Sequence, residues 1–249
     1  MIRGLKLSWK KDAPDSRDLV FDDRTPLAKI PSKIDLRLFC STVENQGTMG
    51  SCTGHAVTGA VELIHNQETG RYNHLSRLFV YYNGRDLDGW PEADDGATIR
   101  SCIKATNKLG IPPEKDWRYL KRNLLTEPPS EVYEKAAQLK VVGYKRIDHR
   151  NINNIRRALA QGLPVVFGFE VFESFMSDKM ARTGKMPLPE KGESSDGGHA
   201  VVIVGYDDAK QHVIVRNSWG RDWGARGYFY MPYVFVTNPK YCADFWTLY

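Results

Sequence analysis

The 249-residue sequence contains no long apolar run, which limits what the chain can do in a membrane. A helix that spans a bilayer needs about 18 to 20 apolar residues, whereas the best runs here are 165–169 and 200–204, which are typical of buried strands. Residues 1–11 carry charges where a secretory signal would have its apolar stretch. We therefore expect no membrane span and no classical signal peptide, with the protein either cytoplasmic or exported by a non-classical route.

The sequence also lacks any concentrated block of positive charge. Lys and Arg number 35 against 30 Asp and Glu, a net charge of +5, but the basic residues are scattered along the chain. Proteins that bind nucleic acid usually gather basic residues, with aromatic residues between them, along one stripe. We expect a solvated charged surface and no nucleic-acid partner.

Cysteine is scarce, with four residues at Cys40, Cys52, Cys102 and Cys242. They include no C-x-x-C pair, and the six histidines show no zinc-ligand spacing beside them. The sequence therefore predicts neither a structural zinc site nor a disulfide scaffold, and it leaves open a single bridge among the four. Since 41% of the residues are hydrophobic and 26% are charged, as in ordinary globular proteins, the useful question is whether one cysteine is reactive.

The residue pattern changes twice along the chain. Residues 1–30 are rich in charge and proline and predict an extended arm. Residues 31–140 predict a mainly helical lobe and residues 141–249 a mainly β lobe, so the expected fold class is α+β. Residues 173–198, which contain several Gly and Pro, predict a mobile loop at a cleft wall. Helices are expected from near Cys52 to Gly70 and over 76–83, 97–109, 130–139 and 151–161, and strands over 141–144, 164–169, 199–206, 213–216 and 228–231.

Three residues have the properties of a nucleophile, a base and an orienting amide. Cys52 lies at the first turn of an expected helix, where the positive end of the helix dipole favours a thiolate. His199 begins an apolar strand after two glycines, and Asn217 follows a second strand. Taken singly, each residue is better explained as a buried cysteine, a buried or surface histidine, and a turn asparagine. Taken together, they have the order and spacing of a catalytic Cys, His and Asn set.

The same residues lie in four ordered motifs, through which residues 31–233 resemble the papain family of cysteine peptidases. The resemblance implies a papain-like two-lobed fold, with a helical lobe, an antiparallel β-barrel-like lobe and an active-site cleft between them. The matching segments are Pro31-Ser-Lys-Ile-Asp-Leu-Arg37, Gln46-Gly-Thr-Met-Gly-Ser-Cys52, Gly198-His-Ala200 with Val204-Gly-Tyr-Asp207, and Asn217-Ser-Trp-Gly220 with Trp223-Gly224 and Gly227-Tyr228.

The resemblance assigns catalytic roles to four of the matching residues. It implies that Cys52 is the nucleophile, that His199 is the general base and acid, and that Asn217 orients His199. It also implies that Gln46 contributes to the oxyanion hole. The expected reaction is hydrolysis of peptide bonds through a Cys52 thioester, without a metal ion or an organic cofactor.

Three further residues match positions that line the cleft in this family. They are Gly96, Ala200 and Trp219, and the indole of Trp219 is also expected to cover the hydrogen bond between His199 and Asn217. The expected partner is a polypeptide substrate. Nothing in the helical periodicity indicates an oligomer interface, so we expect a monomer.

The sequence departs from the family pattern beside the nucleophile and at the N-terminus. Residues 53–55 read Thr-Gly-His where the family usually has Trp-Ala-Phe, and Met49 replaces a cysteine that is commonly disulfide-bonded. We interpret His55 as a core residue or as one that packs against the catalytic residues without touching the substrate. The arm is far shorter than the usual prosegment and resembles that of bacterial or archaeal, xylellain-like members. We hypothesise that residues 1–30 lie across the molecule and regulate the cleft.

Two other functions remain open on the sequence. The chain could be a papain-fold protein whose catalysis has faded and whose cleft captures a peptide, but such a protein has no need for all four catalytic residues. It could also be a cysteine acyltransferase or deamidase, since an amine can resolve a thioester in place of water. Covalent labelling of Cys52 by a peptidyl electrophile would exclude the peptide-binding alternative. Turnover that depends on an amine acceptor would distinguish the acyltransferase from the peptidase.

Overall fold

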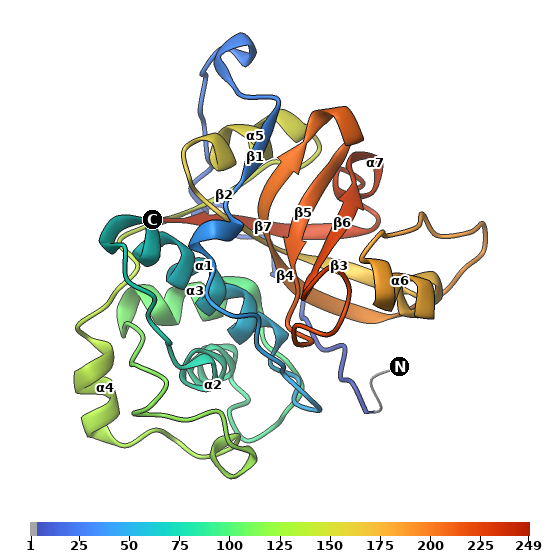
Figure 1. Cartoon of the computed structure of the whole chain (residues 1–249). Coiled ribbons are helices and arrows are strands. Elements are labelled where there is room, and N and C mark those ends of the chain that lie inside the picture. Colours follow the sequence, from blue (N-terminus) through green and yellow to red (C-terminus); the bar gives the residue numbers. More distant parts are fainter. Residues whose placement is uncertain (1–3) are drawn as a thin grey trace.

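One antiparallel sheet, formed mainly by the β-branched and aromatic runs of the second half of the chain, has the helices packed around it (Figure 1). The computed structural model describes residues 4–249. The strand order is β2-β7-β3-β4-β5-β6, with β1 paired to β4, so the path is open and β2 and β6 form its two ends. The strands are β1 Lys33–Asp35, β2 Tyr144–Arg146, β3 Val165–Phe172, β4 Ser195–Asp207, β5 His212–Arg216, β6 Tyr228–Pro232 and β7 Cys242–Leu248.

The helices begin and end where the sequence provides capping residues. Helix α1 ends at Gly70, whose φ of 66° is left-handed and favours glycine. The Ser76 and Thr98 side chains accept N–H groups in the first turns of α2 and α3. The helices are α1 Cys52–Thr69, α2 Arg77–Asp88, α3 Ile99–Lys108, α4 Ser130–Ala136, α5 Ile152–Ala160, α6 Asp178–Thr183 and α7 Tyr233–Val236.

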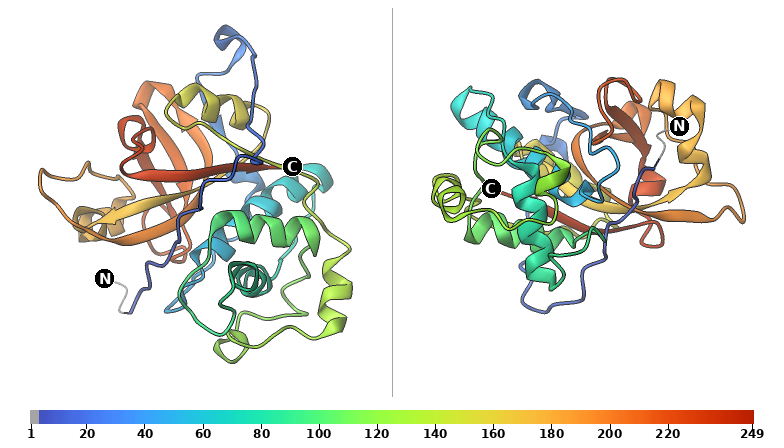
Figure 2. Two further views of the ribbon diagram at one scale, coloured as in Figure 1. Left: turned by 180° about the vertical axis from the view of Figure 1, so that it is seen from behind. Right: turned by 90° about the horizontal axis from the view of Figure 1, so that it is seen from below.

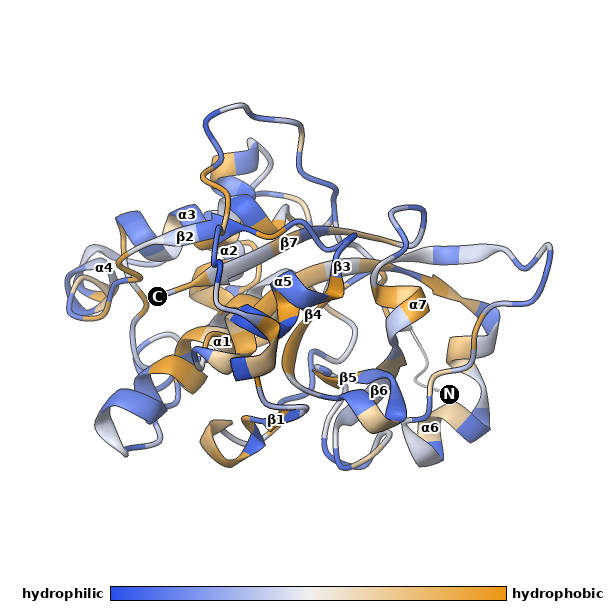
Figure 3. Ribbon diagram, turned by 90° about the horizontal axis from the view of Figure 1, so that it is seen from above, coloured by the Kyte–Doolittle hydropathy of each residue, from blue (hydrophilic) through white to orange (hydrophobic). Residues whose placement is uncertain are grey.

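The helix α1 occupies the centre of the molecule, between the other helices and the sheet. From Cys52 to Leu63 every residue of α1 is buried, because α2 and α3 pack on one side of it and β4 packs on the other. Hydropathy follows this arrangement, since the inner part of α1 and the middle of the sheet are mostly apolar, whereas the outer loops are mostly polar (Figure 3). The N-terminus of α1 is therefore held at the junction of helices and sheet.

The structure confirms the α+β class and corrects several element boundaries. The predicted strand 141–144 is instead β2, which begins at Tyr144, and the strands β1 and β7 were missed. The expected loop 173–198 is largely ordered into a 3-10 helix over 173–176, α6, and the start of β4. Its regular structure was missed because its helices have only four and six residues, too short for a periodic pattern.

The N-terminal arm runs along the boundary between the helices and the sheet (Figure 2). Its described part starts at residue 4 and touches both sides of the boundary before the chain turns back toward β1. The four cysteines are free thiols within the described residues 4–249. No helix in this part of the chain is long and apolar enough to cross a bilayer.

Candidate active site

The Cys52 side chain lies at the first residue of α1 and is completely buried. The backbone N–H groups of Thr53, Ala200 and Ser8 lie near its sulfur. Burial raises the pKa of the Cys52 thiol, and these donors lower it. The Ala200 N–H comes from β4, directly after His199, so the helix and the sheet meet at the sulfur.

His199 is held in one orientation by Asn217 and Trp219. The His199 Nε2 and Asn217 Oδ1 atoms are 2.8 Å apart. Because Asn217 Oδ1 also accepts the Ser218 N–H at 2.8 Å, the oxygen must face His199, which places the imidazole proton on Nε2. The Trp219 indole stacks on the imidazole, with ring centroids 4.9 Å apart.

This arrangement leaves His199 Nδ1 with an available lone pair. Nδ1 is buried and has no hydrogen-bond partner among residues 4–249. Burial lowers the pKa of His199 to about 4, although the hydrogen bond to Asn217 opposes the shift. In this closed state both the imidazole and the Cys52 thiol are therefore driven toward their neutral forms.

The Gln46 carboxamide is fixed on the same side of the site. Ser218 Oγ donates to Gln46 Oε1 at 2.6 Å, and Gln46 Nε2 donates to the Met49 carbonyl at 3.0 Å. The backbone N–H of Gln46 donates to the Ser218 carbonyl at 2.8 Å. Since Nε2 carries two hydrogens, one remains available for an oxyanion.

Gly96 and Ala200, two of the predicted cleft residues, also lie at the site. A Cβ on Gly96, whose φ is 87°, would lie 1.6 Å from the Ser8 carbonyl oxygen, so only glycine fits against the arm there. Ala200 directs its N–H to the Cys52 sulfur. The seven residues predicted for the site, Gln46, Cys52, Gly96, His199, Ala200, Asn217 and Trp219, thus lie in one region, where His199 is bonded to Asn217 and its Nδ1 lies beyond hydrogen-bond distance of the Cys52 sulfur.

The arm residues Lys6–Lys10, here the crossing segment, occupy the space over these groups. Trp9 N donates to the Gly198 carbonyl of β4 at 3.1 Å, whereas Lys10 N donates to the Ala97 carbonyl next to α3 at 3.2 Å. On the helical side, Ser8 Oγ donates to the Gly50 carbonyl at 2.7 Å. The crossing segment thus bonds to both lobes and covers Cys52.

The Trp9 indole fits a slot made by two glycines of the sheet. Trp9 is only 6% exposed. A Cβ on Gly168 of β3 would lie 2.0 Å from Trp9 Cε2, and one on Gly198 of β4 would lie 2.6 Å from Trp9 Cε3. Any side chain at Gly168 would therefore collide with the indole.

The crossing segment does not present a scissile bond to the nucleophile. The Ser8 N–H lies near the Cys52 sulfur, whereas the Ser8 hydroxyl donates to the Gly50 carbonyl and the Ser8 carbonyl oxygen lies against Gly96. Nucleophilic attack requires the sulfur to approach a carbonyl carbon whose oxygen points into the oxyanion hole. The arm in this position covers Cys52 and offers its sulfur no carbonyl carbon to attack.

A family comparison agrees with this geometry. Residues 30–239 match the sequence profile of papain family cysteine proteases. The chain belongs to the papain family of cysteine peptidases. It is therefore a hydrolase, and its substrates are polypeptides.

Two relatives in this family illustrate how much of the chain the likeness covers. A peptidase C1-like protein of Acanthamoeba polyphaga mimivirus is 40% identical over 96% of this chain and 85% of its own length. Cysteine proteinase 2 of Zea mays is 31% identical over 77% of this chain and 52% of its own length. The chain spans about half the length of this plant relative.

Solved structures support the same fold. Xylellain, a cysteine protease from Xylella fastidiosa, has a TM-score of 0.90 and 35% identity, covering 100% of this chain and 97% of the other. The Carica candamarcensis cysteine protease CMS1MS2 in complex with E-64 has a TM-score of 0.63 and 26% identity, covering 81% and 89% of the two chains. The likeness to xylellain therefore includes the arm, and the papain-like fold and the xylellain-like resemblance are confirmed.

Beyond the crossing segment, the papain-family core holds the arm through a group of partly buried charges. We call residues Asp12–Val20 the anchor segment. Arg146 of β2 forms ion pairs with Asp12 at 2.8 Å and with Asp18 at 3.1 Å. Trp246 Nε1 on β7 also donates to Asp12 Oδ2 at 2.8 Å, and Arg100 of α3 pairs with Asp18 at 2.6 Å.

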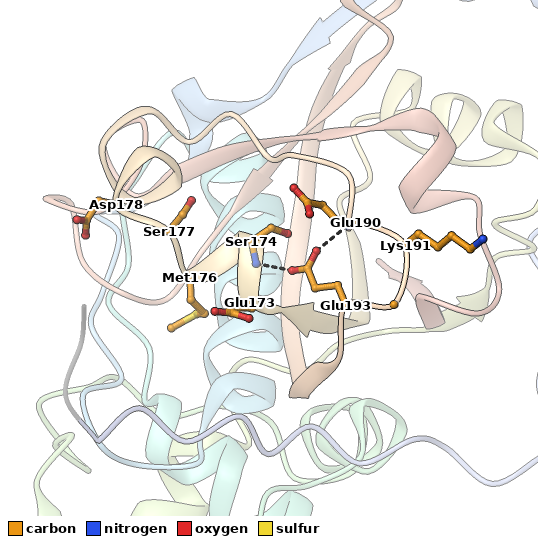
Figure 4. Close-up of a pocket in the computed structure, with 9 residues that line it drawn as sticks. Glu173, Ser174, Met176, Ser177, Asp178, Glu190, Lys191 and Glu193 are labelled. Carbon is orange, nitrogen blue, oxygen red and sulfur yellow. Dashed lines mark hydrogen bonds between the residues drawn. The ribbon is translucent and has the colours of Figure 1, made fainter.

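The segment 173–193 forms an open pocket of about 680 Å³ apart from the catalytic side chains (Figure 4). Glu193 accepts the Ser174 N–H and also the Glu190 N–H, the latter at 2.7 Å, which closes the loop on itself. Phe175 from the same segment packs edge-on against Trp219. The segment therefore supports the tryptophan that covers His199.

Sequence reasoning missed Trp9, Gly168 and Ser218 as parts of the site. A single tryptophan in a charged arm is an unusual burial signal and could have identified Trp9. Ser218 lies inside the recognised Asn217–Gly220 motif, but its bond to Gln46 depends on the fold. Gly168 gives no local signal, because only the indole seated against it shows why a side chain is excluded.

Proposed function

We propose that this papain-family protease cleaves peptide bonds with Cys52 as nucleophile, His199 as base and acid, and Asn217 as the residue that orients His199. The observation that carries the proposal is the His199 Nε2–Asn217 Oδ1 contact of 2.8 Å, which leaves Nδ1 as the proton acceptor. The position of Cys52 at the N-terminus of α1 supports it, because the helix dipole favours a thiolate there.

The reaction begins when His199 Nδ1 takes the Cys52 proton and the sulfur attacks the scissile carbonyl carbon. The negative charge that develops on the carbonyl oxygen is held by the Cys52 N–H and by Gln46 Nε2. The tetrahedral intermediate then collapses, His199 gives its proton to the leaving amine, and a thioester remains on Cys52. Water, deprotonated by His199, attacks the thioester and releases the carboxylic acid and the free thiol.

We propose further that the N-terminal arm inhibits this reaction within the same chain. The crossing segment bonds to both lobes above Cys52 and places the Ser8 N–H near its sulfur, so substrate and arm compete for one space. When the arm leaves, water reaches the site and the burial that disfavours the charged forms of Cys52 and His199 decreases. Release of the arm therefore both opens the cleft and favours the reactive thiolate.

The alternative functions receive less support from the geometry. A protein that only captures peptides has no use for a Gln46 carboxamide held by Ser218 Oγ at 2.6 Å with one hydrogen free. An acyltransferase or deamidase would use the same thioester, and only the acceptor distinguishes it. We therefore place hydrolysis first.

The direct test has two parts. One sample of the protein is incubated with a peptidyl epoxide and its intact mass is measured. A second, unreacted sample is incubated with a peptide, and the products are identified by mass spectrometry. We expect a single adduct on the full chain and two peptide fragments formed without any added amine. Cys52→Ala should abolish both results, and His199→Ala should abolish cleavage.

The matched control is Cys40→Ala, because Cys40 is the one free thiol of the described chain that is only partly buried. It should retain the adduct. An adduct that persists in Cys52→Ala, or cleavage that requires an amine, would contradict the proposal.

A further inference from the structure

A tyrosine outside the catalytic motifs lies on the oxyanion side of the site. Tyr119 belongs to the loop between α3 and α4. Its hydroxyl oxygen is 2.9 Å from the Gln46 carbonyl oxygen and 2.5 Å from Ser51 Oγ. Gln46 carries one proposed oxyanion donor, and Ser51 directly precedes Cys52, whose N–H is the other. One hydroxyl therefore contacts the residue that carries the first donor and the residue bonded to the second.

The acceptors around this hydroxyl determine the direction of each hydrogen bond. Since the Gln46 carbonyl can only accept, Tyr119 donates to it, and Ser51 Oγ therefore donates to Tyr119. His55 Nδ1 lies 3.0 Å from the Ser51 carbonyl oxygen, so this nitrogen carries the ring proton and leaves the Ser51 proton for Tyr119. Burial raises the pKa of the Tyr119 hydroxyl, which keeps its proton for Gln46.

The loop holds the Tyr119 backbone by contacts that do not involve the catalytic residues. The Ser76 hydroxyl, which also caps α2, donates to the Trp117 carbonyl at 2.6 Å. The Tyr119 N–H donates to the Glu114 carboxylate at 2.5 Å. The helical lobe therefore fixes the backbone from which the hydroxyl reaches Gln46.

We propose that Tyr119 is a positioning residue for the oxyanion hole, because its hydroxyl joins Gln46 to Ser51 and so sets the separation between Gln46 Nε2 and the Cys52 N–H. The proposal rests on the proposed catalytic roles of Gln46 and Cys52. It extends the site to a loop that none of the four recognised motifs includes.

Without the hydroxyl, Gln46 stays in the site but loses its link to Ser51. The Gln46 N–H still donates to the Ser218 carbonyl at 2.8 Å, and the Gln46 carbonyl still accepts the Met49 N–H at 3.3 Å. Since a hydrogen bond weakens steeply as its geometry departs from linear, a displaced Nε2 stabilises the developing oxyanion less. The defect should therefore appear in the transition state and not in substrate binding.

The first test is a comparison of full-length variants by steady-state kinetics on one peptide substrate. Loss of a whole oxyanion donor typically costs about 100-fold or more in rate. Tyr119→Phe removes only the hydroxyl that positions such a donor, and we expect kcat to fall about tenfold with KM within about twofold. Tyr133→Phe is the matched control, because its hydroxyl also donates to a side chain of the helical lobe, Asn83 Oδ1 at 3.0 Å. It should leave kcat unchanged.

Two probes distinguish a displaced oxyanion donor from a general loss of structure. Iodoacetamide alkylates a thiolate at a methylene carbon with loss of iodide, so no oxyanion forms, and its rate at Cys52 should be equal in Tyr119→Phe and the wild type. A peptidyl aldehyde instead accepts the Cys52 thiol at its carbonyl carbon, and the oxygen of the resulting hemithioacetal lies where the oxyanion develops. The dissociation constant of the aldehyde, measured by calorimetry, should rise about tenfold in Tyr119→Phe.

The double variant with Gln46→Ala tests whether Tyr119 acts through Gln46. Without the carboxamide there is no Nε2 to position, so Tyr119→Phe should lower kcat by less than about twofold in this background. A tenfold loss that persists in Gln46→Ala would show that Tyr119 acts elsewhere, and it would contradict the proposal.

These readouts separate the inference from the proposed function. A weaker aldehyde complex of Tyr119→Phe, where the wild type cleaves no peptide without an added amine, would retain the inference and refute hydrolysis. An aldehyde affinity equal to that of Tyr133→Phe would overturn the inference. In a protein that cleaves peptides, a kcat equal to that of Tyr133→Phe, or a loss of kcat matched by an equal loss of iodoacetamide labelling, would also overturn it.

Discussion

The crossing segment and the anchor segment belong to one arm, yet the protein holds them by different forces. The crossing segment is held by backbone hydrogen bonds and by the Trp9 indole, which packs directly against the backbone at Gly168 and Gly198. The anchor segment is held by carboxylates paired with arginines, among them the Arg146–Asp12 pair at 2.8 Å. Shape complementarity holds the crossing segment over Cys52, whereas ion pairs hold the anchor segment against β2, β7 and α3.

This difference predicts different sensitivities. A shape-based contact is lost when one side chain is removed or when the slot is filled, because dense packing leaves no alternative arrangement. A charge-based contact responds to pH and salt, and it is strongly weakened when one partner of a buried pair is removed. Access to Cys52 should therefore depend more on contacts of the crossing segment than on contacts of the anchor segment.

The largest effect is expected from Trp9→Ala. Removal of a buried tryptophan typically costs about 3–5 kcal/mol, so we expect the rate of Cys52 labelling by a peptidyl epoxide to rise about 100-fold. Leu19→Ala is the control in the same arm, since Leu19 is 66% exposed. Equal labelling rates in both variants and the wild type would mean that the indole does not close the site.

Filling the slot should act in the same direction with a smaller effect. Gly168→Val places a Cβ where the indole now lies, 2.0 Å from Trp9 Cε2. We expect it to raise the rate of Cys52 labelling about tenfold. The peptidyl epoxide should carry only small side chains, so that the valine does not obstruct the probe itself. In the double variant with Trp9→Ala the valine should add nothing, because the collision is gone. Additive effects in the double variant would show that the glycine acts through something other than Trp9.

Loss of the central arginine should loosen the anchor segment and leave the crossing segment largely in place. Arg146→Met deprives Asp12, Asp18 and Asp244 of a shared cation, and removing one partner of these partly buried pairs leaves carboxylates uncompensated. Amide exchange should accelerate strongly at Phe21, and Cys52 labelling only about threefold. Arg150→Met, which removes an exposed ion pair with Asp148, is the control.

The smallest effect is a dependence of the anchor on pH. Burial, together with the nearby charge of Asp12, raises the pKa of Asp244 to about 6, and burial also raises the pKa of Asp12. Arg146, Arg100 and Asp18 face the same cluster. Groups whose pKa is raised in the docked state favour docking below their ordinary pKa near 4, and the contribution is lost as the pH rises through 6.

Hydrogen exchange at the Trp9 and Lys10 amides, corrected for the intrinsic rate, measures this dependence in Cys52→Ala protein. Protection should fall between pH 4 and 6 by less than about tenfold per unit and then level off. Asp244→Asn should flatten most of the change. A protection that increases with pH would reverse the assigned sign.

The sequence predicted which elements carry the proposed catalytic residues, because each of these residues lies in a motif that determines its own surroundings. Cys52 begins the predicted helix, His199 lies on the predicted strand, and Asn217 follows another. The strand β7 was not predicted, because its residues alternate poorly and Asp244 lies within it in a left-handed conformation, with φ of 56°. Long-range pairing with β2 and β3 forms this strand.

The position of the arm could be predicted only in outline. Its charge and proline content indicate an extended segment, and the family resemblance indicates a cleft for it to cross. The seat of Trp9 depends on Gly168 and Gly198 lying on neighbouring strands, at positions that pair with Ala200 and Glu170. Such register is fixed by the whole sheet, so no local pattern reveals it.

The most direct test of the central claim is a steady-state comparison of the full chain with Trp9→Ala on one aromatic peptide substrate, with active sites titrated in both. An arm that competes with substrate for the cleft raises the apparent KM by the inverse of the open fraction and leaves kcat unchanged. We therefore predict a lower KM and an equal kcat for Trp9→Ala. An unchanged KM in Trp9→Ala would contradict the claim that the arm closes an otherwise assembled active site.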